Sequence, residues 1–336
     1  MASINSIAES DHSPGIGVNH LLPGSKEIAT RLQVLRQNIA KVFLGKENVI
    51  QLSLTALLAE GHLLVEDVPG VGKTLLAKGL AKSLDCVYHR IQFTPDLLPG
   101  DLLGTNIFHQ PTGQFVFQPG PMFAQVILAD EINRASPRTQ SALLEAMSER
   151  QITLDGQSRP LGPPFFVIAT QNPYEFEGTF PLPESQLDRF MIRLEIGYPD
   201  RRIEKDLLQQ HRQGEPVDQL PAVLQTKDLL QLQQIVRTVK VVDSLAEYMI
   251  ALIEATRQHP ELALGCSTRG LLALYRSVQA WALLSDRDYA VPDDVKILLV
   301  PVLSHRVLSR RWMQGKRDDS TKIVLREILK QIPVPV

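Results

Sequence analysis

The stretch that decides the fold is residues 61–74, GHLLVEDVPGVGKT, where a short apolar segment meets a glycine-rich turn. Residues 63–65 are typical of a buried strand, and a helical pattern begins at Lys73 and Thr74. A strand, a glycine turn and a helix in this order predict a loop whose backbone N–H groups surround a polyphosphate. The N-terminus of the helix adds about half a positive charge at the same place.

Residues of this loop have distinct expected roles. Lys73 is expected to reach the β- and γ-phosphates, and the Thr74 hydroxyl to bind Mg²⁺. Such a loop usually begins with glycine six residues before the lysine, where this chain has Asp67. Residues 42–45 fit either an apolar wall for an adenine ring or a plain turn between helices. The residues predicted to contact nucleotide are Asp67, Val68, Pro69, Gly70, Val71, Gly72, Lys73, Thr74, Leu75 and Gly45.

Composition narrows the class of protein. The 336 residues are 44% hydrophobic and 21% charged, which is typical of a globular protein with two domains, or one large and one small. A net charge of −2 without a basic run argues against a nucleic-acid-binding protein. Cys86 and Cys266 have apolar neighbours, which indicates buried, reduced thiols and a cytoplasmic protein.

The ends of the chain and its apolar segments carry no membrane or secretion pattern. Residues 1–24 lack a basic start followed by an apolar run, and we expect a flexible tail there. The longest helix-like apolar segment, 271–284, contains Arg276 and is too short to cross a bilayer. We therefore expect no membrane insertion.

Apolar runs and helical periods alternate as far as residue 199 and then become purely helical. The expected strands are 63–65, 87–93, 125–131, 165–170 and 191–196, and the helices among them are 25–43, 47–58, 73–81 and 137–149. The later helices are 201–212, 227–239, 243–258, 268–284, 292–304 and 320–331. This pattern predicts a tail (1–24), an α/β domain with a five-stranded parallel sheet (25–199) and a helical domain (200–336).

Two segments of the α/β domain are predicted hairpins. Residues 106–117 turn at Pro111 to Gly113, and residues 151–161 turn at Asp155-Gly156. The first hairpin carries three phenylalanines, Phe108, Phe115 and Phe117, which favours a surface that binds a partner.

The predicted strand 125–131 ends in two acids, Asp130 and Glu131. Next to Lys73 and Thr74, Asp130 is expected to hold Mg²⁺ through water, and Glu131 to orient or deprotonate an attacking water. The alternative interpretation is that Asp130 and Glu131 only begin a solvent-exposed loop after the strand.

Four motifs together resemble AAA+ ATPases. They are residues 66–74 (EDVPGVGKT), 129–135 (ADEINRA), 169–173 (ATQNP) and 187–190 (LDRF), and the first three are similar to the MoxR family almost word for word. The two hairpins resemble the clade that also holds magnesium chelatase subunits and replicative helicases. The resemblance spans about residues 26–332, and that family often has aspartate at the position of Asp67. It implies an AAA+ phosphate-loop core with a C-terminal helical lid, ATP and Mg²⁺.

The resemblance also assigns further residues. Asn172 resembles the sensor that positions the water, with a strand-end cap as the alternative. Arg189 is similar to the arginine finger that reaches the nucleotide of a neighbouring subunit, with a surface ion pair to Glu184 or Asp188 as the alternative. Arg269 resembles the second sensor, with an ordinary first-turn arginine as the alternative, and Arg134 is close enough to relay between subunits.

The function implied is an ATP hydrolase that acts as a chaperone-like remodelling or assembly factor. Its implied partners are itself, in a homo-oligomeric ring taken as a hexamer, and a client protein such as one with a von Willebrand factor A domain. A DNA-translocating motor is disfavoured because the hairpins carry mainly apolar residues, with only His109 and Arg159 as basic side chains nearby. A nucleotide switch without hydrolysis and a chelatase motor subunit are the remaining alternatives.

Overall fold

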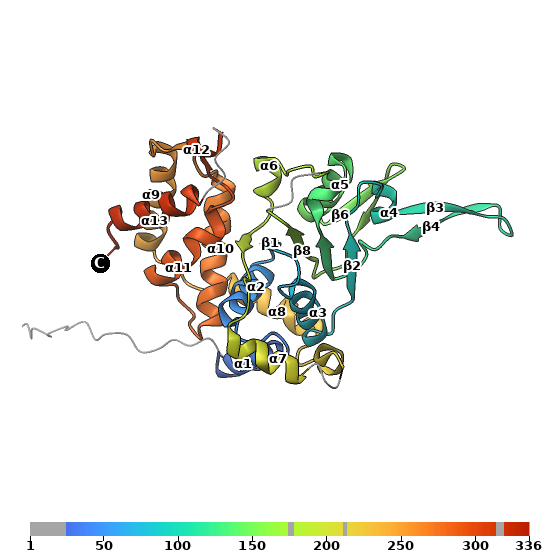
Figure 1. Ribbon diagram of the computed structural model, residues 1–336, viewed down its shortest axis with the longest axis horizontal. Coiled ribbons are helices and arrows are strands. Elements are labelled where there is room, and N and C mark those ends of the chain that lie inside the picture. Colours follow the sequence, from blue (N-terminus) through green and yellow to red (C-terminus); the bar gives the residue numbers. More distant parts are fainter. Residues whose placement is uncertain (1–24, 174–177, 211–213, 314–318, 336) are drawn as a thin grey trace, which may run out of the picture.

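The computed structural model describes residues 25–173, 178–210, 214–313 and 319–335, so the predicted tail lies outside the described residues. Its centre is a five-stranded sheet with every pair parallel, in the order β2-β5-β8-β1-β9 (Figure 1). The strands are β1 (Leu63–Glu66), β2 (Tyr88–Gln92), β5 (Val126–Asp130), β8 (Phe166–Gln171) and β9 (Ile192–Leu194). The predicted five-stranded parallel sheet is confirmed.

The two faces of the sheet are covered by different helices, because alternate residues of a strand point to opposite sides. Leu63 and Val65 pack with α1 (Ser25–Ala40), α2 (Glu47–Leu58) and α3 (Lys73–Ser83). Leu64 packs on the other face with α5 (Pro137–Glu149). Burial on both faces explains the unbroken apolar runs of β1, β5 and β8.

The first helix ends earlier than its periodicity predicts. α1 stops at Ala40 instead of residue 43, and turns follow over residues 41–45. A Cβ on Gly79 of α3 would lie 3.4 Å from Val42 Cγ2, and one on Gly72 would lie 3.2 Å from Phe43 Cε2. The turn therefore places Val42 and Phe43 against α3 and its start, which a continued helix would not do.

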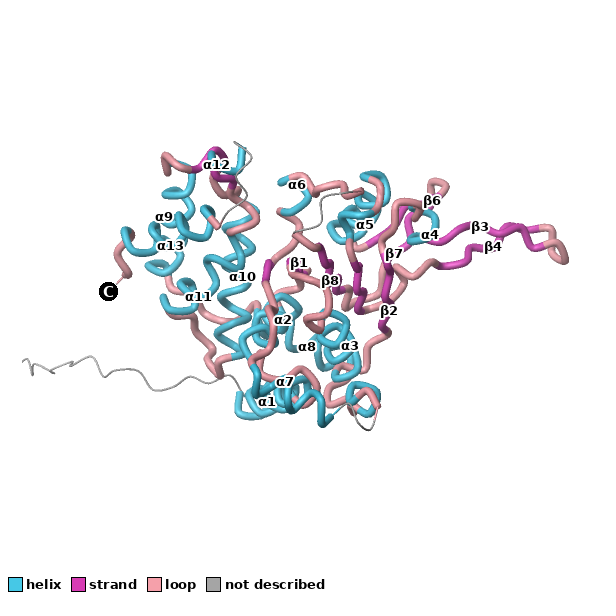
Figure 2. The backbone as a smooth tube through the Cα atoms, viewed as in Figure 1, coloured by secondary structure: helices cyan, strands magenta, loops and turns pink. Residues whose placement is uncertain are grey.

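Both predicted hairpins are present. The first is β3 (Gly104–His109) and β4 (Gln114–Pro119), and it follows the short helix α4 (Pro99–Leu103). The second is β6 (Gln151–Leu154) and β7 (Gln157–Pro160), directly after α5. The β3–β4 hairpin projects away from the sheet (Figure 2).

The hairpins contact each other. Asn106 Nδ2 donates to Asp155 Oδ2 at 2.6 Å, and the Arg159 guanidinium lies 4.0 Å from the centre of the Phe117 ring. Because β6 continues from α5, a shift of α5 would move both hairpins together.

The C-terminal half is helical. A bundle is formed by α9 (Asp243–Gln258), α10 (Thr268–Leu284), α11 (Pro292–Leu303) and α13 (Ser320–Gln331), with the short helix α12 (Arg310–Met313) and the strand pair β10 (Leu262–Leu264) and β11 (Leu308–Ser309). α7 (Arg201–Gln210) and α8 (Thr226–Val236) instead lie beside α1, α2 and α3 (Figure 1). The domain boundary between residues 199 and 200 stays a prediction. Across the described ranges, every helix is too short or too polar to span a bilayer.

His62 ties the start of β1 to two other elements. Its Nε2 lies 3.1 Å from the Met147 carbonyl oxygen and its Nδ1 accepts from the Val167 amide at 3.1 Å, so the ring is neutral with its proton on Nε2. Burial, together with the nearby Arg150 charge, lowers the pKa of His62 from 6.5 to about 4, although its bond to Met147 opposes this.

The free energy of unfolding should therefore fall as pH drops from 6.5 toward 4, because the unfolded chain binds the proton first. Over this pH range, protonation of His62 in the unfolded chain should lower the free energy of unfolding by an amount on the order of 3 kcal/mol. His62→Gln keeps one donor and one acceptor without titrating, so its urea-unfolding free energy should depend less on pH in this window. Equal pH slopes for the two proteins would contradict the assignment.

Candidate nucleotide-binding site

The loop between β1 and α3 has the backbone of a phosphate cradle. Gly70 and Gly72 have φ values of 82° and 98°, and Gly72 is the N-cap of α3. A Cβ on Gly70 would meet nothing within 4 Å, so glycine is required there for its backbone angle alone. Phe43, beside Gly72, brings residues 41–45 to the loop. Gly45 also has a positive φ and lies against Ile203 of α7. Its contact with adenine stays a prediction.

Asp67 has a structural role that explains its place in the loop. Its Oδ2 accepts from the amides of Ile196 and Gly197, at 2.7 and 2.6 Å, and its Oδ1 accepts from the Val68 amide at 2.8 Å. This buried carboxylate joins the start of the phosphate loop to the chain that leaves β9. Glycine at this position would leave those amides without that acceptor.

Replacing Asp67 by alanine should lower the free energy of unfolding by about 2–4 kcal/mol, since hydrogen bonds to a buried charged group are lost together. Asp67→Asn is the matched control, because its amide oxygen still accepts from Ile196 and Gly197, and it should lose less. Urea denaturation without nucleotide measures both. An alanine variant as stable as the wild type would show that these bonds contribute nothing net.

Lys73 lies near three acids, Asp67, Asp130 and Glu131. Its ammonium donates to the Asp67 carbonyl oxygen at 2.6 Å. Burial lowers the pKa of Lys73, and the carboxylates of Asp130, Asp67 and Glu131 act in the opposite direction. Lys73 is thus within electrostatic reach of both acids at the end of β5. Its side chain folds back on its own loop, in position to turn toward an anion.

Asp130 is held by two partners. Its Oδ1 accepts from the Thr170 hydroxyl at 2.6 Å, and its Oδ2 pairs with Arg90 Nη2 at 2.6 Å. Among the described residues, no group of three or more His, Cys, Asp or Glu side chains could hold a metal ion. Mg²⁺ usually takes one or two protein oxygens and completes its shell with water and phosphate, so the oxygens of Thr74 and Asp130 fit it.

Glu131 follows β5 in the left-handed region, with φ of 56°. Its amide donates to the buried Thr170 hydroxyl at 2.9 Å, so Thr170 orients both acids. The Glu131 carboxylate accepts from Gln92 Nε2 at 2.8 Å and pairs with Arg134 Nε at 3.4 Å. Gln92 and Arg134 thus hold the Glu131 side chain in place, and it remains partly exposed at the C-terminal end of β5.

Asn172 directly follows β8, the strand between β5 and β1, and is half-buried. It therefore lies at the C-terminal ends of the parallel strands, where the phosphate loop and the two acids also lie. Beside it, the buried Glu66 accepts from Gln171 and pairs with Arg193 of β9.

Arg189 and Arg269 are positioned differently from the other predicted residues. Arg189 Nη1 donates to the Leu144 carbonyl oxygen at 3.0 Å and to the Ser148 hydroxyl, both in α5. Arg269 is exposed in the first turn of α10. In the part of the chain that the structure describes, neither side chain bonds to the phosphate loop, and Arg189 forms no ion pair with Glu184 or Asp188.

Sequence interpretation missed three residues of this site: Arg90, Gln92 and Thr170. The register places Gln92 beside Asp130 on adjacent strands. Two polar side chains at alternate positions of an edge strand, and a hydroxyl at the end of an apolar run, were the available signals. Cys86 is also less buried than predicted, being half-exposed, while Cys266 is buried.

Comparisons with known proteins agree with this geometry. A model of the ATPase family associated with various cellular activities (AAA) matches residues 62–192, and an AAA lid domain model matches residues 254–327. Chaperone MoxR1 of Mycobacterium tuberculosis is 37% identical over 325 residues, covering 93% of this chain and 85% of that protein. The uncharacterised YeaC of Bacillus subtilis is 48% identical over 300 residues, covering 89% and 93%. A crystal structure of a predicted ATPase from Cytophaga hutchinsonii has a TM-score of 0.85 at 36% identity, covering 93% and 97%.

A parallel sheet of this order, a glycine loop beside two acids and a C-terminal helical lid define an AAA+ ATPase, and hence a nucleotide-binding protein. Within that class the chain belongs to the MoxR family. The predicted fold and family are both confirmed.

Proposed function

We propose that this chain hydrolyses ATP in a ring of identical subunits, taken as a hexamer, and uses the cycle to remodel or assemble a protein partner. The observation that carries the proposal is the division of the site. Lys73, Asp130 and Glu131 lie together at the C-terminal ends of the parallel strands. Arg189 instead donates hydrogen bonds to α5 and makes none to its own phosphate loop. A guanidinium so placed is available to an adjacent subunit.

In this mechanism the backbone N–H groups of residues 70–75 hold the phosphates, and Lys73 turns from the Asp67 carbonyl to the β- and γ-phosphates. Thr74 and Asp130 would hold Mg²⁺, which neutralises charge on the phosphates when bound. As the resemblance to AAA+ ATPases implies, Asp130 would hold the ion through water, and Thr170 and Arg90 orient its carboxylate.

The remaining residues act on the water and the transferred phosphate. Glu131 accepts a proton from the attacking water, which Asn172 orients. Arg269 contacts phosphate from the lid of its own subunit. Arg189 acts from the neighbouring subunit, and Arg134, paired with Glu131, relays between them.

A protein client fits the hairpins better than DNA does. Phe108 and Phe115 are 51% and 71% exposed and pack edge to face at the outer part of the β3–β4 hairpin. Residues 104–119 contain no lysine or arginine, whereas a surface that binds a DNA strand needs cationic side chains that contact its phosphates. Membership of the MoxR family supports a client with a von Willebrand factor A domain.

The two free thiols, Cys86 and Cys266, support a cytoplasmic location for the protein.

Size analysis with and without ATP, followed by phosphate release, tests the proposal. We expect ATP and Mg²⁺ to favour a closed ring, and turnover per subunit to rise with protein concentration as rings form. A monomer at all concentrations with unchanged turnover would overturn the shared site. Salt-sensitive stimulation by single-stranded DNA would instead favour the motor, and ATP binding without phosphate release would favour the switch.

A further inference from the structure

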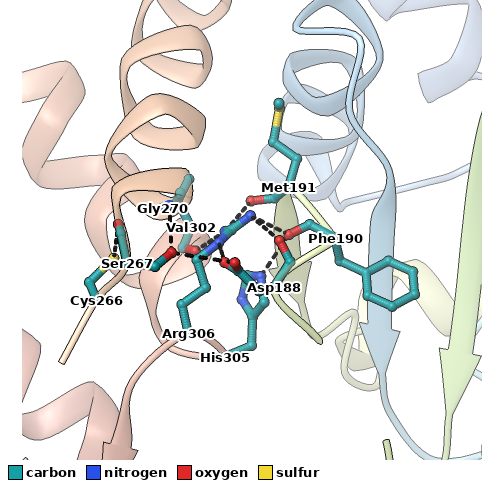
Figure 3. Close-up of polar contacts among 9 residues, drawn as sticks. All are labelled: Asp188, Phe190, Met191, Cys266, Ser267, Gly270, Val302, His305 and Arg306. Carbon is teal, nitrogen blue, oxygen red and sulfur yellow. Dashed lines mark hydrogen bonds and ion pairs between the residues drawn. The ribbon is translucent and has the colours of Figure 1, made fainter. Parts of the chain in front are cut away.

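The lid is joined to the segment that carries Arg189 by one buried arginine. Arg306, just after α11, donates from Nε to Asp188 Oδ1 at 2.8 Å and from Nη2 to the Phe190 carbonyl oxygen at 2.6 Å (Figure 3). It also donates to the carbonyl oxygens of Asp188, at 3.2 Å, and Met191, at 3.0 Å. One guanidinium thus holds three of the four residues 188–191, between α6 (Glu184–Leu187) and β9.

A second link runs from the same carboxylate into α10. Ser267 donates from its hydroxyl to Asp188 Oδ2 at 3.3 Å and accepts from the Gly270 amide at 3.2 Å, so the cap of α10 also touches Asp188. A Cβ on Gly270 would lie 3.0 Å from Arg306 Cδ and 2.3 Å from Cys266 Sγ, so the helix start packs directly on the arginine. We call Arg306, Asp188 and Ser267 the lid joint.

The central residue of the lid joint, Arg306, is buried. The Arg306 side chain is 2% exposed and Asp188 is its one ion-pair partner in the described chain. Burial lowers the pKa of Arg306, and Asp188 raises it. The neighbouring His305, also buried, donates from Nε2 to the Phe190 carbonyl oxygen at 2.8 Å, and burial and the Arg306 charge hold its pKa well below 6.5. Separating the joint would leave a buried charge without a partner, so lid and segment should move as one body.

The lid joint lies next to both predicted arginines. Arg189 directly follows Asp188, and Arg269 lies between Ser267 and Gly270. Arg269 would sense nucleotide in its own subunit, whereas Arg189 would serve the next one. Any lid movement that follows nucleotide at one site is therefore transmitted to the residue offered to the adjacent site.

We propose that Arg306 is a positioning residue for Arg189: it fixes the 188–191 segment to the lid, so that lid position in one subunit sets the arginine presented to its neighbour. This inference rests on the proposed shared site. A lysine at 306 has one nitrogen and cannot bond the carboxylate and the carbonyls in the same fork.

Mixed rings test the positioning role. Arg306→Lys alone should bind a fluorescent ATP analogue like the wild type and lose turnover by about 10²-fold, because Arg189 is misplaced. Glu131→Gln has an inactive site and an intact Arg189. In 1:1 mixed rings of the two, turnover should recover to about one quarter of the wild-type rate per subunit, since half the sites are competent and half of those have a competent neighbour.

Three controls separate the possible failures. Arg189→Ala mixed with Glu131→Gln must recover in the same way, and no recovery there would overturn the shared site itself. Recovery with Arg189→Ala and none with Arg306→Lys would overturn the positioning role alone, as would wild-type turnover of Arg306→Lys. Arg287→Lys changes another lid arginine, which pairs with Asp294 inside the lid at 2.8 and 2.6 Å, and should hydrolyse ATP at the wild-type rate.

A second variant keeps the test open if Arg306→Lys does not fold. Asp188→Asn keeps an acceptor for Arg306 Nε and removes the charge, and it takes the same place in the mixed rings. Loss of folding in both variants, with Arg287→Lys folded, would assign the lid joint to stability alone and overturn the proposal.

Discussion

Glu131→Gln should bind ATP as tightly as the wild type and release almost no phosphate. Removing a general base lowers turnover by about 10²–10⁴-fold. Binding should survive because the change adds no bulk and leaves the contacts that shape the loop. The Glu131 amide still donates to Thr170, and Gln92 Nε2 still has a side-chain oxygen to bond at residue 131.

Nucleotide affinity by fluorescence and steady-state phosphate release measure the two properties separately. Glu149→Gln, an exposed change at the end of α5, is the matched control and should leave both unaltered. Normal turnover in Glu131→Gln would remove Glu131 from its proposed role. Equal loss of binding and turnover would instead mean that the carboxylate shapes the site and does no chemistry.

Arg189→Ala should also bind ATP, assemble into rings and lose turnover by about 10³–10⁵-fold, the range for an arginine supplied to a phosphoryl group from outside its own site. The guanidinium stabilises charge that develops only in the transition state, so binding of the substrate barely depends on it. Folding should be little affected, because the bonds lost are to the Leu144 carbonyl and to Ser148, which is exposed.

The comparison is made at a concentration where both proteins are assembled by size analysis. Arg326→Ala, at an exposed position of α13, is a control for the loss of an arginine from the surface and should retain wild-type turnover. If assembled Arg189→Ala rings hydrolyse ATP normally, the arginine is not part of the active site, whatever the ring does.

Much of the fold could be predicted because its signals are local. The strand 63–65, the glycines that follow this strand and Lys73 all lie within a dozen residues. The unbroken apolar runs that end at Asp130 and Thr170 indicate strands buried on both faces. The predicted hairpins turn where Asp155-Gly156 and residues 111–113 allow it. The end of α1 was predicted less well, because the turn at 41–45 is stabilised by α3, which the local pattern does not contain.

By itself, the sequence determined the phosphate loop, the pair of acids, the hairpins and the helical C-terminal half, since each depends on backbone preferences and burial along one short segment. Tertiary structure alone decided the strand order and the long-range bonds built on it. Asp67 is 129 residues from Ile196, and Asp188 is 118 residues from Arg306. These pairs meet only because packing of sheet and lid brings distant segments together, and no spacing within either segment encodes its partner.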